Sequence, residues 1–261
     1  MLTLAEKINL DRVLTEKLKG LDTEKINALS GKCLDKGFHI LKKENDLMRL
    51  AVILTLAVKV KEKYNLAGID ENIYYSTMSD IRIWCENNGN RGLKNYGWLK
   101  NHVSFELFRI GRLQFQFYES KSKTLIYNRL PFDCGTKLIY IHIPQGERLE
   151  KERCVEAIGK AGEFFKKYFP DYKYGYYFCE SWLLFEGNRA FMAKDSNILS
   201  FMSLFELCYS VKIDAQAIDR IFGKRHLLKS RYPENTDLQR RAKRYMQEGN
   251  RLGIGVGVIK K

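Results

Sequence analysis

The hydrophobic periodicity of this chain first changes near Gly111. Before this glycine, apolar residues recur at three-to-four spacing and no proline interrupts them, which is typical of helices with one buried face. Helices are therefore expected over residues 22–35, 44–64, 71–87 and 93–108.

After Gly111 the period becomes two. Leu113, Phe115 and Phe117 alternate with polar residues, which predicts a strand with one buried face. Further strands are expected over residues 124–128, 137–143, 174–185, 210–213 and 252–259. Helices are expected over residues 150–168, 197–207 and 215–222, and after a capping box formed by Thr236 and Gln239.

The order of these elements predicts the fold class. A helix between the strands 137–143 and 174–185 makes that pair parallel, while the other strands follow one another as antiparallel neighbours. We therefore expect an α/β (α+β) fold with a mixed, mostly antiparallel twisted sheet and helices on both faces, preceded by a helical region. We place the domain boundary between a helical region, 1–108, and a second domain, 109–261.

Composition excludes several classes of protein. The chain has 261 residues and is 45% hydrophobic, enough for a substantial core. Its six cysteines form no CxxC pair and lie at no metal-ligand spacing, so reduced thiols and no metal are expected. The N-terminus lacks the pattern of a secretory signal, and the apolar run 47–60 is shorter than the roughly 20 residues of a bilayer span. A cytoplasmic protein without a membrane span is expected.

The net charge of +14 favours anionic partners, and basic residues concentrate between Arg220 and Arg251. The expected helix 238–246 carries much of this charge, either as a solvated face or as a site for a phosphate or an acidic substrate. Nucleic-acid binding is possible but less favoured, because Tyr232 and Tyr245 are the nearby aromatic residues that it would use for stacking.

Several segments resemble one known superfamily. They are YGWLKNHVSFELFRIGRLQF (96–115), IHIPQGERL (141–149), CESWLL (179–184), DSNILSF (195–201), PENTDLQ (233–239) and RLGIGVGVI (251–259). In these segments the chain resembles the GNAT acyltransferases, and more closely a bacterial group with a helical N-terminal half and a GNAT-like C-terminal half. The resemblance implies that the pantetheine thioester of an acyl-CoA lies between the strands 137–143 and 174–185, which separate and leave backbone groups free to bind it.

The same resemblance implies a pyrophosphate loop at the N-terminus of the following helix, where free N–H groups favour an anion. The cofactor-binding residues would be Ile143, Gln145, Gly146, Glu147, Arg148, Leu149 and Asn197. The superfamily's second glycine is missing here, and Glu147 brings a negative charge. The alternative is a strand-to-helix turn whose acids complement the helix dipole.

A second glycine-rich stretch, RLGIGVG, imitates the phosphate pattern near the end of the sequence. Only four residues follow Gly257, so no helix is expected to open there. Alternating glycines on a strand instead clear one face, for close packing or for contact with a ligand.

Acyl transfer to an amine requires a base for the amine and an acid for the departing thiolate. His142 is a candidate base, or a structural histidine, on the same strand face as Tyr140. Glu180 is a second candidate base, since burial among aromatic residues raises proton affinity, although it can equally pair with a lysine. Alternation places Cys179 and Ser181 on the opposite face from Glu180.

Three further residues complete the candidates. Cys179 is either an acyl-accepting nucleophile or a small buried residue, and Ser181 can hydrogen-bond substrate or sulfur. GNAT enzymes often use a tyrosine on the helix after this strand as the acid, but here Tyr209 follows the expected helix instead. His102 and its neighbours in YGWLK either shape an acceptor pocket or pack.

The sequence therefore predicts an acyltransferase that moves an acyl group, acetyl or longer, from acyl-CoA to an unidentified amine by direct attack. The acceptor would be a small molecule or a peptide. The alternative is a non-catalytic binding or regulatory protein of the same fold, which would use its basic C-terminal surface for nucleic acid or an acidic partner.

Overall fold

The computed structural model describes residues 1–121 and 129–261. The predicted strand 124–128 lies outside the described residues. The chain forms two compact units: the first comprises Met1–Gln116, Ile143–Glu147 and Glu163–Pro170, and the second comprises Phe117–His142, Arg148–Gly162 and Asp171–Lys261. The predicted domain boundary between residues 108 and 109 remains a prediction.

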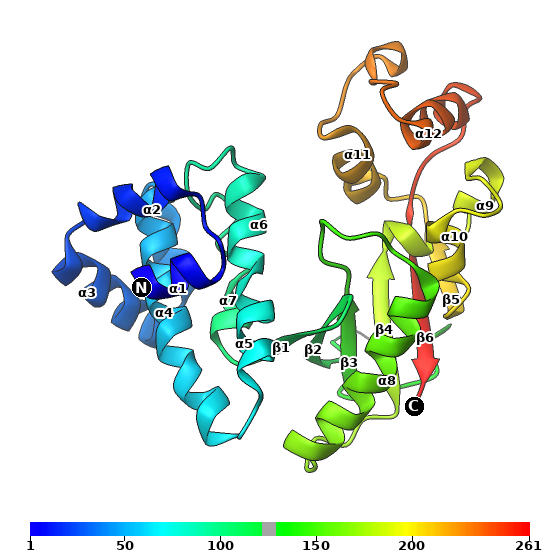
Figure 1. The fold of residues 1–261 in the computed structure, drawn as a ribbon. Coiled ribbons are helices and arrows are strands. Elements are labelled where there is room, and N and C mark those ends of the chain that lie inside the picture. The colour runs from blue at the N-terminus through cyan, green and yellow to red at the C-terminus, as the bar shows by residue number, and fades with distance from the viewer. Residues whose placement is uncertain (122–128) are drawn as a thin grey trace. The chain divides into compact units, whose positions relative to one another are not determined.

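Helices make up most of the first unit, in blue to cyan in Figure 1. They are α1 (Leu2–Lys7), α2 (Arg12–Lys19), α3 (Thr23–Lys36), the 3-10 helix η1 (Phe38–Lys43), α4 (Asp46–Leu66), α5 (Glu71–Met78), α6 (Asp80–Glu86) and α7 (Lys100–Val103). Side chains of Asp11, Asp22, Asn45 and Asp70 accept backbone N–H bonds at the starts of α2, α3, α4 and α5, which is the usual role of these residue types.

Helix α4 is the central helix of this unit, because it is buried on most of its circumference. Leu50, Ala51, Val52, Ile53 and Leu54 are all fully buried in one continuous run. A helix that is apolar all round must lie inside a protein or a membrane. No helix within residues 1–121 and 129–261 is long and apolar enough to cross a bilayer.

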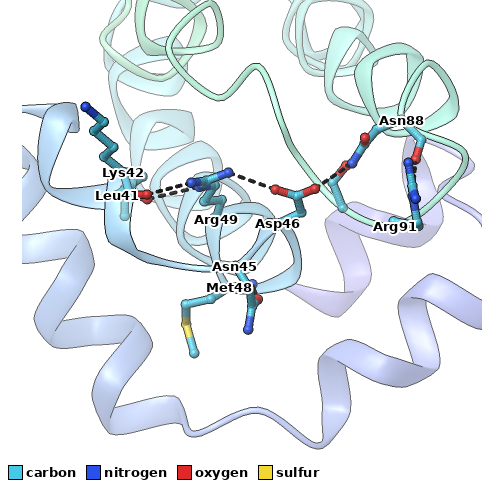
Figure 2. A network of polar contacts seen from close by, with 9 residues as sticks. Leu41, Lys42, Asn45, Asp46, Met48, Arg49, Asn88 and Arg91 are labelled. Carbon is cyan, nitrogen blue, oxygen red and sulfur yellow. Dashed lines mark hydrogen bonds and ion pairs between the residues drawn. The ribbon is translucent and has the colours of Figure 1, made fainter.

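A polar network fixes a loop to the first turn of α4 (Figure 2). The Asp46 carboxylate accepts hydrogen bonds from the Arg49 guanidinium at 2.8 Å and from the Asn88 amide at 2.9 Å. The backbone carbonyl of Asp46 also accepts the Leu93 N–H at 2.8 Å. A Cβ on Gly92 would lie 2.3 Å from that carbonyl oxygen, so only glycine permits this approach. The segment after α6 is therefore anchored as a loop.

This anchoring explains why the predicted helix 93–108 is wrong. Only Lys100–Val103 is helical, and Leu107–Ile110 is a strand. Phe105 has a φ of +64°, which ends any helix. Leu93 and Leu99 are fully buried although neither lies in a helix, so their spacing reflects burial in a loop. The predicted helix 71–87 is divided between α5 and α6 at Ser79.

The strands form one mixed sheet in the order β1-β2-β3-β4-β6-β5. Their bounds are β1 (Leu107–Ile110), β2 (Leu113–Glu119), β3 (Lys137–His142), β4 (Tyr176–Ser181), β5 (Glu206–Val211) and β6 (Ile254–Lys260). Strands β3 and β4 are parallel and are joined through α8 (Lys151–Tyr168), whereas β4 with β6 and β5 with β6 are antiparallel. The predicted fold class is confirmed.

The predicted single buried face of β2 is wrong. Leu113 and Phe115 are buried as expected, but Arg112 and Gln114 on the alternate positions are buried as well. The Gln114 amide lies 3.4 Å from Nε2 of His102 in the interior. Both faces of this strand are therefore covered by protein.

Shorter elements follow β4. They are η3 (Trp182–Leu184), α9 (Asn188–Phe191), α10 (Asn197–Met202), α11 (Ala215–Phe222), η4 (Lys229–Arg231) and α12 (Asp237–Gln247). The predicted strand 174–185 ends early, because the Ser181 hydroxyl accepts the Leu183 N–H and starts η3. The predicted helix 197–207 ends at Met202, and the strand expected at 210–213 begins earlier, at Glu206. The capping box of Thr236 and Gln239 is confirmed.

The alternating glycines of β6 and its approach permit close packing. A Cβ on Gly255 would lie 1.9 Å from the Leu184 carbonyl oxygen, and one on Gly253 would lie 2.2 Å from the Val211 carbonyl oxygen. These neighbours are backbone atoms, which cannot move aside as a side chain can. Of the two predicted alternatives, close packing therefore accounts for these glycines.

Replacing Gly255 by alanine should destabilise the protein by at least about 1–3 kcal/mol, because the added methyl group meets backbone. Gly159→Ala on α8 is the matched control, since a Cβ at this position would have nothing within 4 Å of it. This control should raise stability by about 0.5–1 kcal/mol through helix propensity. Urea unfolding of both variants measures the difference, and equal stabilities would contradict the proposed packing.

Candidate functional site

The parallel pairing of β3 and β4 ends before either strand does. Within these fully described strands, only Ile139 with Tyr177 and Tyr140 with Phe178 are paired. On its other side β4 pairs with β6 as far as Ser181 opposite Gly255. The last residues of β4 are therefore held by β6 and have no ladder partner in β3. The pairing ends toward His142, which is where the resemblance implies that the two strands separate.

Three polar side chains share the sheet face beside this separation. The Tyr140 hydroxyl donates a hydrogen bond to the Glu180 backbone carbonyl at 3.1 Å. The His142 imidazole stacks on the Tyr140 ring, with ring centres 4.2 Å apart and planes inclined by 21°. Tyr140 thus contacts both the His142 ring and the backbone of Glu180. Tyr140 was missed as a site residue, although its position two residues before His142 was the available signal.

Burial changes the proton affinities of this group. Burial raises the pKa of the Glu180 carboxyl above its ordinary value. Burial, followed by the nearby Cys179 and Glu180, raises the pKa of Tyr140 well above its ordinary value. The Tyr140 phenol therefore keeps its proton at neutral pH and is a hydrogen-bond donor in the site.

Cys179 and Ser181 lie on the opposite face of β4. Cys179 is 0% exposed, and burial raises the pKa of its thiol. A thiolate nucleophile needs the reverse, a lowered pKa and access, so this environment favours the alternative of a buried packing residue. The Ser181 hydroxyl is occupied by the Leu183 N–H at 3.2 Å, which gives it a structural role at the start of η3.

Tyr209 lies on the same sheet face as Tyr140 and Glu180, two strands from β4, whereas Asn197 lies in a helix. Tyr209 is opposite Val256 in the pairing of β5 with β6 and packs against the apolar cluster that includes Phe178. It is on a strand, whereas the resemblance placed the acid on a helix. Asn197 is the exposed first residue of the six-residue helix α10. In the described part of the chain it makes no hydrogen bond to another candidate residue.

The predicted pyrophosphate loop is exposed from Gln145 to Arg148. Gly146 has a φ of +113°, which explains the glycine, and nothing lies within 4 Å of a Cβ built there. The sequence predicted that Gly146 permits a close approach to its backbone. Among the described residues, no protein atom makes such an approach. Ile143 is half-buried and Leu149 is buried, so both contribute apolar surface at the ends of the loop.

Side chains from the first unit hold this loop. The Asn87 amide donates to Gln145 Oε1 at 3.0 Å, and Arg109 forms an ion pair with Glu147 at 2.6 Å. Arg112 donates to the backbone carbonyls of Pro144 at 2.9 Å and of Glu147 at 2.7 Å. The negative charge that departs from the superfamily pattern is therefore paired.

His102 belongs to a buried polar cluster rather than to an open site. Its imidazole contacts the Asp80 carboxylate at 3.0 Å, and Trp98 donates to the same carboxylate at 2.7 Å. Burial by itself raises the pKa of Asp80, but the hydrogen bonds from His102 and Trp98 outweigh it and lower the pKa. Packing therefore accounts for His102.

Much of the charge on α12 is used inside its own unit. Lys243 is 8% exposed and donates to the carbonyls of Ser230 at 2.7 Å and Tyr232 at 2.9 Å. Arg241 pairs with Asp237 at 2.5 Å. Tyr232 is buried, so it cannot stack on a base. These contacts weigh against a nucleic-acid surface on this helix.

The residues described by the structure contain no group of histidine, cysteine, aspartate and glutamate side chains that could hold a metal ion.

The raised pKa of Glu180 predicts how stability depends on pH. Its neutral form is favoured in the folded state, so its stabilising effect is present below the ordinary carboxyl pKa of about 4.3 and is lost as pH rises through the folded pKa. Glu180→Gln should therefore be more stable than the native protein at pH 8, with a gap that closes toward pH 4. Urea unfolding across this range measures the gap.

The exposed Glu163 on α8 provides the control, because Glu163→Gln should show no gap of this kind. A Glu180→Gln protein that is less stable than the native one at every pH would show that the carboxylate is paired rather than desolvated.

Two family models match the chain. The N-acyltransferase N-terminal domain matches residues 2–105, and the GNAT-like C-terminal domain matches residues 107–259. No curated protein matches the chain by sequence.

Solved structures of acyltransferases share the fold. An acyltransferase mutant in complex with octanoyl-CoA and an acyltransferase in complex with decanoyl-CoA and teicoplanin are each 18% identical, with a TM-score of 0.80 over 99% of this chain and 86% of theirs. An acyltransferase in complex with decanoyl-CoA is 20% identical, with a TM-score of 0.70 over 81% of this chain and 65% of its own. With the family matches, this likeness identifies the chain as a member of the GNAT-like N-acyltransferases.

Proposed function

We propose that the protein transfers an acyl group from acyl-CoA to an amine by direct attack of the amine on the thioester. The observation that carries this proposal is the early end of the pairing between β3 and β4. The fold is shared with acyltransferases crystallised with octanoyl-CoA and decanoyl-CoA, which supports a CoA thioester as the donor.

The amide-containing arm of the cofactor would lie along the unpaired ends of β3 and β4. Backbone N–H and C=O groups that lack a ladder partner are strong hydrogen-bonding groups, and the amides of pantetheine complement them. The Glu180 carbonyl already accepts the Tyr140 hydroxyl, so the arm would either use other groups or displace this bond. The pyrophosphate would bind the loop Gln145–Leu149, with Arg148 supplying charge and α8 contributing the positive end of its dipole. Strand, loop and helix follow one another directly in the chain.

The chemistry requires two proton movements. As the amine nitrogen forms its bond to the thioester carbonyl carbon, His142 takes its proton, directly or through water, with Glu180 as the second candidate base. The carbon–sulfur bond then breaks, and the thiolate takes a proton to leave as CoA. Tyr209 is the candidate acid for this step. Tyr140 is a weaker acid, because burial raises its pKa, and its hydroxyl already donates to the Glu180 carbonyl.

The acceptor is proposed only by chemical class, as the amine of a small molecule or a peptide. One acyltransferase of the same fold was crystallised with decanoyl-CoA and teicoplanin, which shows that the scaffold in that protein accommodates a large acceptor. The acyl chain is best defined by comparing donors, because octanoyl and decanoyl groups are the ones bound by the structural neighbours.

The first test is titration calorimetry with acetyl-CoA, octanoyl-CoA and decanoyl-CoA, followed by acyl transfer to a panel of amines. We expect saturable binding, and we expect His142→Ala to lower kcat by about 10²–10⁴-fold with little change in the affinity for acyl-CoA. His39→Ala is the control, because His39 is an exposed histidine on η1.

Absence of binding by all three thioesters would overturn the proposed donor. Binding with an unchanged kcat in His142→Ala would leave the donor in place and remove His142 from the chemistry.

A further inference from the structure

Glu147 puts a carboxylate into a loop for which we propose an anionic ligand, and the structure pairs this carboxylate with Arg109. The two side chains meet at 2.6 Å. The Arg109 side chain is 10% exposed and that of Glu147 is 39% exposed. The ion pair thus has a mostly buried cation and a carboxylate that reaches the surface of the loop.

The backbone of Arg109 is held by a hydrogen bond to helix α5 of the first unit. Its backbone N–H donates to Thr77 Oγ1 at 2.9 Å, and the Thr77 hydroxyl donates to the Ile73 carbonyl at 2.7 Å. Arg109 also lies in β1, opposite Gln114 of β2. Because the Arg109 backbone is held in this way, less conformational entropy is lost when the guanidinium forms the ion pair.

Arg112 determines which way the peptide groups of the loop point. Its side chain donates to the carbonyl oxygens of Pro144 and Glu147, and the residue is 4% exposed. In a trans peptide the C=O of one residue and the N–H of the next point in opposite directions. The N–H groups of Gln145 and Arg148 therefore point away from Arg112. Inward carbonyls and outward N–H groups are the arrangement that binds anions.

We propose that Arg109 and Arg112 are positioning residues that make the loop Pro144–Arg148 able to bind the pyrophosphate of acyl-CoA despite Glu147. Arg109 offsets the charge of the carboxylate, and Arg112 orients the peptide groups. This inference rests on the proposed function, because it concerns the same cofactor. It differs from a direct phosphate contact, since Arg109 acts through Glu147.

A role of Arg109 through Glu147 and a direct contact of Arg109 with phosphate predict different effects when both residues are substituted together. If Arg109 acts by offsetting Glu147, Arg109→Gln removes this ion pair, raises the net negative charge beside the ligand and should weaken CoA binding by about tenfold or more. Glu147→Gln should bind CoA more tightly than the native protein. The double variant should return to within about threefold of native affinity, because charges that interact do not act additively.

The test is titration calorimetry with CoA on the native protein, both single variants and the double variant, with thermal unfolding of each as a check on folding. Octanoyl-pantetheine, which lacks the pyrophosphate, is a second probe in the transfer assay. Arg109→Gln should leave kcat/KM for this truncated donor unchanged while lowering kcat/KM for octanoyl-CoA. A purely structural defect would lower both values equally.

The outcomes separate this inference from the proposed function. If the native protein does not bind CoA, the proposed function fails first. If the native protein binds CoA but the double variant is as weak as Arg109→Gln, the inference is overturned. Should Arg109→Gln fail to fold, Glu147→Gln alone decides, because weaker binding by this variant contradicts the inference and tighter binding supports it.

Discussion

The early end of hydrogen bonding between β3 and β4 is the constraint on which the rest of this structure depends. A strand end without a partner is normally unfavourable, so β4 must be held from its other side. Strand β6 does this over the whole length of β4, and its approach is possible because Gly255 has no side chain to meet the Leu184 carbonyl. Strand β4 is therefore paired along its whole length with β6, but only at Tyr177 and Phe178 with β3.

Side chains of the first unit contact the loop after β3. Asn87 donates to the Gln145 side chain, Arg109 pairs with Glu147, and Arg112 donates to the carbonyls of Pro144 and Glu147. A loop that binds an anion needs oriented N–H groups and little negative charge. We propose that Arg112 meets the first need and Arg109 the second, so that the loop can bind a phosphate despite Glu147.

The parts of the fold that sequence could predict are those governed by local patterns. Alternation separated Glu180 from Cys179 and Ser181 on β4, and the capping box located the start of α12. The predicted helix 93–108 was wrong although its apolar spacing is helical. The contact of Leu93 with Asp46 and the positive φ of Phe105 prevent a continuous helix there. No local pattern carries either feature.

In the candidate site, too, local patterns were readable from the sequence but contacts between distant residues were not. Glu147 looks unfavourable for a phosphate loop when only its neighbours in sequence are considered, and its partner Arg109 lies 38 residues away. Tyr140 reads as a core aromatic until its hydroxyl is seen on the Glu180 carbonyl. The roles of His142, Glu180, Ser181, Cys179 and Tyr209 remain predictions, with burial weighing against Cys179 as a nucleophile.

Hydrogen–deuterium exchange tests the central claim most directly. Peptides that cover β3 and β4 should exchange more slowly when octanoyl-CoA is bound, because the arm of the cofactor would occupy backbone groups that otherwise bond to water. Peptides from α3 should not change. Slower exchange elsewhere, with β3 and β4 unaffected, would show that the thioester does not lie between these strands.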